Sequence, residues 1–223
     1  MKKLLTIAIA MMAAAGAMAQ SKVYFTKEIT PESLVKVYKA LGVEPTGRVA
    51  VKISTGEPGG RNYLKPTLIR NLVDEVKGII VECNTAYGGR RSTSAEHRKA
   101  IHEHGFDSIA RVDIMDEEGN MNIPVKDTTH IKYDIVGSHL ANYDFMVNLA
   151  HFKGHAMGGF GGVLKNASIG VASADGKAYI HSAGKVQSPK ELWQNLPAQD
   201  YGRCGAGSAR LHEGSRGLHQ RDE

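Results

Sequence analysis

The sequence predicts a single α/β domain built on a mainly parallel β-sheet with helices on both faces. Short runs rich in valine and isoleucine alternate along the chain with longer segments whose apolar residues recur at helical spacing. Three of these runs lead directly into loops dense in glycine, polar and charged residues, at positions 55–62, 83–93 and 151–165. Because the carboxyl ends of parallel strands lie at one edge of a sheet, this placement also predicts a ligand site.

The first half of the domain is expected to begin with a short strand at 23–25. A helix over 31–41 follows, with Thr30 as its N-cap and proline at its first position. The next β-rich run covers 49–54. A second helix, over 65–76, has its leucines, isoleucine and valines at helical spacing.

The second half continues the alternation. A strand at 78–82 runs into the loop at 83–93, and a helix over 94–104 ends at Gly105. A fourth strand covers 110–114. The polar segment 117–139 predicts a small hairpin or lid, and the last strand of the sheet begins at Phe145.

The N-terminus has the composition of a secretory signal peptide. Lys2 and Lys3 precede an apolar run at 4–15, and small residues at 17–19 precede Gln20. We therefore expect residues 1–19 to be removed and the mature protein to be exported, either to the periplasm or out of the cell. No later stretch has the roughly 18 apolar residues that a membrane span needs, so no span is expected.

The predicted domain covers 20–200, and a tail follows at 201–223. From Gly202 on, the tail is rich in glycine and arginine and has only two leucines as large apolar residues, which predicts a disordered or frame-shifted segment. The sheet would then be incomplete at its C-terminal side, and an uncovered edge favours self-association. Export permits a disulfide between the two cysteines, Cys83 and Cys204, although Cys204 lies in this tail.

Charge and motif spacing narrow the class of ligand. The formal charge is +5, with acidic and basic residues interspersed, which is not the basic patch of a nucleic-acid-binding protein. The glycine-rich stretches lack the spacing of a P-loop and of a dinucleotide fingerprint. Several arginines and lysines nevertheless follow the strands, so the expected partner is a small anionic molecule.

The stretch 151–170, HFKGHAMGGFGGVLKNASIG, combines the most chemistry in the fewest residues. His151, His155 and Lys165 are the predicted catalytic residues. Glycine backbone N–H groups and nearby cations would hold the anion or cofactor. The predicted binding residues are Gly158, Gly159, Gly161, Gly162, Arg90, Arg91, Lys153 and Asn166.

Two alternatives concern the histidines of this stretch. His151 and His155 are four residues apart and would share a metal ion if the segment were helical, with Glu82, Cys83 or Asp113 as further ligands. As neutral groups they would instead carry protons. The sequence leaves the identity of any metal open.

Other reactive residues have simpler interpretations. Cys83 would be a nucleophile if the two arginines of its loop lowered its pKa, but a cysteine at a strand end is more often inert packing. The histidines of the predicted helix at 94–104 are expected to form a solvated face. They are His97, His102 and His104.

Three blocks of the sequence resemble a known family. VAVKISTGEPGG, VECNTAYGGRRST and HFKGHAMGGFGGVLKNASIG are similar to the signature blocks of the domain of unknown function 362 family, often labelled uncharacterised iron–sulfur center proteins. The label implies a [4Fe–4S] cofactor, but the chain has no C-x-x-C, and such a cluster takes four thiolates. An alternative function is therefore a part of an iron–sulfur electron-transfer protein whose cluster-binding segment is absent from this chain.

The last block also resembles, more remotely, the lactate racemase family. In those nickel-pincer enzymes a histidine stands ten residues before a cofactor-linked lysine, and His155 and Lys165 have that spacing. The second catalytic histidine of that family has no counterpart at 88–91. The leading expectation is an exported domain that binds a small anionic ligand or cofactor at the strand ends, either as an enzyme or as the remnant of one.

Overall fold

The computed structural model describes residues 21–155 and 158–195. The predicted signal peptide, the predicted tail and Cys204 lie outside these described residues. No helix within the described ranges is long and apolar enough to cross a membrane.

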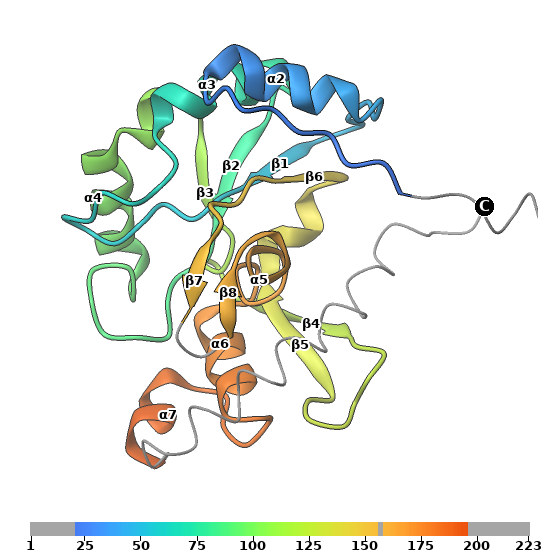
Figure 1. Ribbon diagram of the computed structural model, residues 1–223. Coiled ribbons are helices and arrows are strands. Elements are labelled where there is room, and N and C mark those ends of the chain that lie inside the picture. The colour runs from blue at the N-terminus through green and yellow to red at the C-terminus, as the bar shows by residue number, and fades with distance from the viewer. Residues whose placement is uncertain (1–20, 156–157, 196–223) are drawn as a thin grey trace, which may run out of the picture.

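A four-stranded parallel sheet forms the centre of the fold, in the order β3-β2-β1-β6 (Figure 1). The prediction of an α/β domain with a parallel sheet is confirmed. In the middle of the sheet, Val51 is paired with Ile80 on one side and with Val147 on the other. The strands are β1 (Val49–Lys52), β2 (Ile79–Glu82), β3 (Val112–Ile114) and β6 (Phe145–Asn148).

Three helices pack on one face of this sheet: α2 (Pro31–Ala40), α3 (Pro66–Glu75) and α4 (Ser94–His104). Their apolar faces meet Val51 and Ile80 in the larger hydrophobic core. Each large aliphatic side chain buried in such a core stabilises the fold by about 1.5–3 kcal/mol. The members contributed by the helices and by the turn after α4 are Ile69, Leu72, Val73, Ile101 and Phe106.

Local signals explain where these helices begin and end. Thr30 caps α2 because its hydroxyl oxygen accepts a hydrogen bond from the Ser33 backbone N–H, and the Ser33 hydroxyl oxygen accepts one from the Thr30 backbone N–H. Thr93 precedes α4, and Gly105 ends it in the left-handed conformation at φ 81. The bounds of α4 are those predicted from the sequence.

The other face of the sheet packs against an antiparallel hairpin, a 3-10 helix and the chain around Val171. Ala50, Val81 and Met115 meet Val136 and Val171 there. β4 (Asn120–Pro124) and β5 (Tyr133–Gly137) form an antiparallel hairpin, so the hairpin expected within 117–139 is present. Of two short 3-10 helices, η1 (Phe106–Ser108) belongs to the larger core through Phe106, and η2 (Ser138–Asn142) packs on the hairpin face through Leu140.

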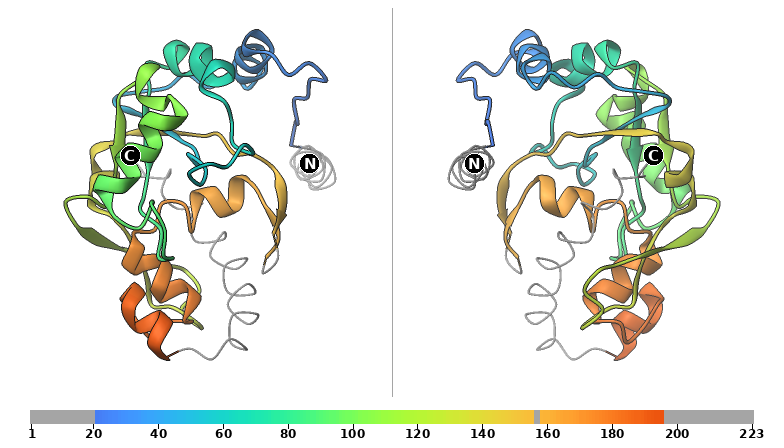
Figure 2. Two further views of the ribbon diagram at one scale, coloured as in Figure 1. Left: turned by 90° about the vertical axis from the view of Figure 1, so that its left-hand side faces the viewer. Right: turned by 90° about the vertical axis from the view of Figure 1, so that its right-hand side faces the viewer.

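A second, smaller core joins α6 (Ala174–His181) to β5, with α7 (Pro189–Asn195) beside it. These helices lie at the end of the molecule opposite α2 and α3 (Figure 2). α6 and β5 approach closely at Gly176, where a Cβ would lie 1.9 Å from the carbonyl oxygen of Ile135. Only glycine permits this approach.

One predicted strand is wrong. Residues 23–25 form no strand, and Val23 and Phe25 are 89% and 80% exposed. The segment pairs with no strand of the described residues, although β3 and β6 are edge strands of the sheet. An apolar run needs a partner ladder to become a strand, and the sequence alone does not reveal whether one is in reach.

Candidate functional site

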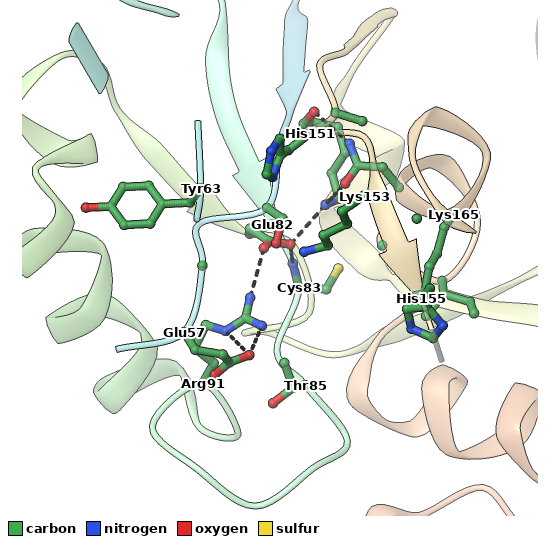
Figure 3. Close-up of a pocket in the computed structure, with 18 of the residues that line it drawn as sticks. Glu57, Tyr63, Glu82, Cys83, Thr85, Arg91, His151, Lys153, His155 and Lys165 are labelled. Carbon is green, nitrogen blue, oxygen red and sulfur yellow. Dashed lines mark hydrogen bonds and ion pairs between the residues drawn. The ribbon is translucent and has the colours of Figure 1, made fainter. Parts of the chain in front are cut away.

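The three polar loops predicted from the sequence converge on one cavity of about 290 Å³ (Figure 3). The cavity lies at the carboxyl ends of β1, β2 and β6, where the backbone leaves the sheet at Ser54, Cys83 and Ala150. Parallel strands end at the same edge, so loops far apart in sequence meet there.

Most of the predicted site residues line this cavity, but three do not. Arg90 points away from it and forms ion pairs with Glu103 at 2.6 Å and Glu96 at 3.5 Å, on the outer side of α4. Gly158 lies in the turn before β8 (Gly159–Gly161) and Gly159 is the first residue of that strand, and neither lines the cavity. The predicted residues that line the cavity are His151, Lys153, His155, Gly161, Gly162, Lys165, Asn166 and Arg91.

A buried charge network forms the floor of the cavity. Lys52 at the end of β1 is 1% exposed, and its Nζ lies 2.9 Å from Oε2 of Glu82, which is 5% exposed. Arg91 approaches the other carboxylate oxygen of Glu82 at 3.3 Å and also pairs with Glu57. Lys52 and its partners come from three different segments, so the network holds the loops together.

Glu82 is ionised in this environment. Burial alone would raise its pKa, but the positive charges of Lys52 and Arg91 lower it to about 2. The backbone N–H groups of Thr55 and Cys83 donate further hydrogen bonds to the carboxylate, each at 3.1 Å. A carboxylate paired and hydrogen-bonded in this way is a structural anchor rather than an acid or base for chemistry.

His97 was expected on a solvated helix face, and that prediction is wrong. Its ring is fully buried between the first two loops, with Nε2 3.1 Å from the Thr55 hydroxyl and Nδ1 3.2 Å from the Asn84 amide oxygen. Burial lowers its pKa to about 4, so the ring is neutral at pH 7. It fastens the loop after β1 to the loop after β2.

His104 also departs from the solvated face, whereas His102 is exposed as expected. Nδ1 of His104 donates to the Thr55 carbonyl at 2.7 Å, and its ring stacks on Tyr63 at a centroid distance of 4.2 Å. Tyr63 lines the cavity. The spacing of the histidines along the helix does not indicate these contacts, because Thr55, which both His97 and His104 contact, lies 42 and 49 residues earlier in the sequence.

Three more lysines line the cavity: Lys153, Lys165 and Lys177. In the part of the chain that the structure describes, none of the three has a carboxylate within 4.0 Å of its Nζ. Lys177 is buried and donates to the Ala172 carbonyl at 2.5 Å. Burial and then the charges of its lysine neighbours hold the pKa of Lys165 below its usual value.

The stretch 151–170 is built from a two-stranded ribbon and a short helix. The ribbon consists of β7 (Lys153–His155) and β8 (Gly159–Gly161), and the helix is α5 (Val163–Ala167). Asn166 connects the helix to the sheet, because its Nδ2 donates to the Lys52 carbonyl at 2.9 Å and to the Asn148 side chain at 2.8 Å. Its Oδ1 accepts from Lys52 Nζ at 3.0 Å.

The alternative of a shared metal ion required a helix at 151–155. His155 instead lies in β7, and His151 precedes that strand. The two histidines therefore do not stand one helical turn apart on a common helix face. Asp113 is occupied elsewhere by His139 and Tyr143, and no group of three or more possible ligands is found among the described residues.

Cys83 is buried beneath the cavity, and its thiol donates to the Val171 carbonyl at 3.3 Å. Burial raises its pKa to about 12, so the thiol is protonated and is not an activated nucleophile. It is the single cysteine of the described residues, which therefore hold no four-thiolate cluster set.

Several residues of the site were not predicted. Lys52 and Lys177 look like ordinary residues of a strand and a helix, and no motif marks Tyr87, whose hydroxyl lies 2.6 Å from His181 Nε2. The available signal for Lys52 was a lysine inside an apolar strand, since a buried lysine needs a counter-charge. The sequence contains a weaker indication that Lys177 belongs to the site.

One family model matches the chain. It is described as Domain of unknown function (DUF362) and covers residues 49–218, which is more than half of the sequence. The match begins at β1 and includes every element that lines the cavity. No curated protein matches the chain.

Proposed function

This chain belongs to the family described as domain of unknown function (DUF362), and from that premise we propose that it binds a small organic anion in the cavity at the carboxyl ends of β1, β2 and β6. The description of the family assigns no activity. The charges that line the cavity support the proposal instead.

The observation that supports the proposal most is an excess of positive charge. Five cationic side chains line the cavity, against two carboxylates, Glu57 and Glu82. Arg91 is paired with both carboxylates, and Lys52 is paired with Glu82. The remaining positive charges stay without a counter-ion among the described residues. The three are Lys153, Lys165 and Lys177.

The size and chemistry of the cavity favour a compact ligand. A volume of about 290 Å³ lies at the lower end of the range for small-molecule sites. Because the guanidinium of Arg91 is already held by two carboxylates, recognition falls to lysine ammonium groups, which act as compact point charges. A carboxylate or phosphate group on a molecule of a few carbon atoms fits both conditions.

The ammonium groups approach the cavity from different elements. Figure 3 has Lys153 on β7 and Lys165 on α5, on the side opposite Glu57 and Arg91. Lys177 reaches the same cavity from α6. An anion between them would relieve the repulsion of like charges that desolvation strengthens.

Binding is tested by titrating oxalate, citrate and inorganic phosphate into the full chain and measuring heats and shifts of the unfolding midpoint. At least one of the anions is expected to bind, with an affinity that falls as salt is added. Lys165→Ala and Lys153→Ala should each weaken binding. Lys126→Ala, which removes an exposed lysine from the β4–β5 connection, is the control and should not. Equal affinities for all three variants would refute the proposal.

We also propose that the protein is exported and that residues 1–19 are removed. The basic start, apolar run and small residues before Gln20 support this. N-terminal sequencing of the protein from fractionated cells should read from Gln20 in the exported fraction. A mature product that retains Lys2 and Lys3 would contradict it.

A further inference from the structure

We propose that Lys165 forms an imine with a carbonyl-bearing anion, so that the ligand class is a small oxo acid or a phosphorylated aldehyde or ketone. The inference depends on the anion site proposed above and specifies its substrate. It is based on the surroundings of the four lysines that line the cavity.

Three of the four lysines are engaged or lie near solvent. Nζ of Lys52 is surrounded by the Glu82 carboxylate, the Asn166 amide and the Ile53 carbonyl. Nζ of Lys177 is buried and donates to Ala172. Lys153 is exposed on β7. A nucleophilic lysine needs an amine nitrogen that is not held by other protein groups, and that nitrogen must lie close to the substrate. None of these three lysines meets both conditions.

Lys165 meets both conditions. It lines the cavity, it is half-buried, and its Nζ has neither a hydrogen bond nor an ion pair with any described residue. Burial and the positive charges of Lys177, Lys153 and Lys52 all lower its pKa, whereas Glu82 acts in the opposite direction. Desolvation and cationic neighbours are the two influences that increase the unprotonated, nucleophilic fraction of a lysine.

His155 is a proton-carrying group that lines the same cavity. Figure 3 has its ring beside the Lys165 side chain, and the charge of Lys165 lowers the pKa of His155, although burial is the larger cause. Nδ1 of His155 accepts a hydrogen bond from the Gly158 N–H at 3.1 Å. The neutral ring therefore carries its proton on Nε2.

The chemistry balances without an oxidant or a reductant. The neutral form of the Lys165 amine attacks the carbonyl carbon, a C–N bond forms as the C=O π bond opens, and one proton passes from the nitrogen to the oxygen to give a carbinolamine. Protonation of the hydroxyl then breaks the C–O bond and releases water, and the nitrogen gives up its remaining proton to leave the neutral imine. Proton transfer by His155 would assist both steps, while the lysine charges hold the carboxylate or phosphate.

The fold also fixes where Lys165 stands. Its neighbour Asn166 is hydrogen-bonded to Lys52 of β1 and to Asn148 of β6, so α5 is held in place against the edge of the sheet. A nucleophile on a helix that is held against two strands approaches a ligand from a defined direction.

Reductive trapping tests the imine. The full chain is incubated with sodium cyanoborohydride and either pyruvate or glycolaldehyde phosphate, which pair a carbonyl with a carboxylate or a phosphate. Peptide mass spectrometry is expected to find one reduced adduct, mostly on Lys165. Lys165→Arg, which keeps the charge but cannot form an imine, should lose that adduct. Lys153→Arg is the matched control within the same cavity and should retain it.

The controls distinguish the two proposals. If oxalate binds but neither carbonyl compound labels Lys165 in preference to the other lysines, the imine is wrong and the anion site stands. If no anion binds and labelling is spread over exposed lysines, both are wrong. Labelling of Lys165 that oxalate suppresses in the wild type would support both, since oxalate occupies the site without forming an imine.

Discussion

Replacing Glu82 by glutamine is the most direct test of the charge network beneath the cavity. The change keeps the size of the side chain and removes its charge, so Lys52 and Arg91 lose the carboxylate between them. Lys52 is 1% exposed and lies 2.9 Å from Glu82. Leaving one partner of a buried ion pair uncompensated costs about 3–5 kcal/mol of folding free energy.

The pKa of Glu82 provides a second measure of the same effect. A carboxyl group whose pKa falls from 4.5 to about 2 on folding stabilises the folded state by about 3 kcal/mol at neutral pH. Since the folded-state pKa is the lower one, this stabilisation is complete above pH 4.5. It is lost as the pH falls from 4.5 toward 2.

Denaturant unfolding of wild type and Glu82→Gln at a series of pH values measures both effects. Glu82→Gln is expected to be less stable at pH 7 by the amount given for the broken pair, with a smaller loss of stability between pH 4.5 and 2. Glu103→Gln, which removes an exposed carboxylate paired with Arg90, is the control and should match wild type. The double variant Lys52→Met, Glu82→Leu should recover only part of the loss, because it leaves no charge unpaired but removes the acceptor of the buried Thr55 and Cys83 N–H groups.

A Glu82→Gln protein within about 1 kcal/mol of wild type at pH 7, with an unchanged pH profile, would refute the reasoning. It would mean that water reaches Lys52 and replaces the carboxylate.

Three further predictions concern single sites. Asp134 is buried with one oxygen unpartnered, and burial raises its pKa from 3.8 to about 6. Asp134→Asn should therefore stabilise the protein by about 3 kcal/mol at pH 7. Denaturation curves should show that this gain in stability vanishes as the pH falls from 6 to 3.8. Gly176→Ala should lower stability by about 2 kcal/mol or more, because the added Cβ would lie 1.9 Å from a carbonyl oxygen, whereas Gly154→Ala, with nothing within 4 Å, should not. In a Cys204→Ser background, Cys83 should react with iodoacetamide roughly a thousandfold more slowly in the folded than in the unfolded chain, since folding raises its pKa from 9.0 to about 12. Comparable rates for the folded and unfolded chains would mean that the thiol is accessible.

Local signals were sufficient for most helices and strands up to β6, but β7, β8, α5 and α6 were not predicted. The helix predicted at 94–104 has those bounds because Thr93 and Gly105 mark its ends by backbone chemistry alone. The segment 23–25 failed for the opposite reason: a strand depends on a neighbour, and the composition of the segment does not supply one.

The candidate site was predictable only in outline. Placing the polar loops after the strands located the cavity, because topology brings strand ends together. The sequence did not indicate which of Arg90 and Arg91 lines the cavity. That depends on which carboxylate pairs with each guanidinium, and Arg90 pairs with Glu103 whereas Arg91 pairs with Glu82. The burial of His97 likewise depends on Thr55, 42 residues earlier.

The central position of β1 has a consequence for how the chain folds. β1 pairs with β2 after a short crossover, but its other neighbour, β6, arrives much later in sequence, and the Arg48–Asp144 contact that begins this pairing joins residues 96 positions apart. Closing the longer loop costs more entropy, so β1, β2 and β3 are expected to assemble first with their helices. The cavity needs the ribbon and α5, which follow β6. Its ligand therefore has no site on the early intermediate, and binding should slow unfolding of the completed protein without accelerating the first folding step.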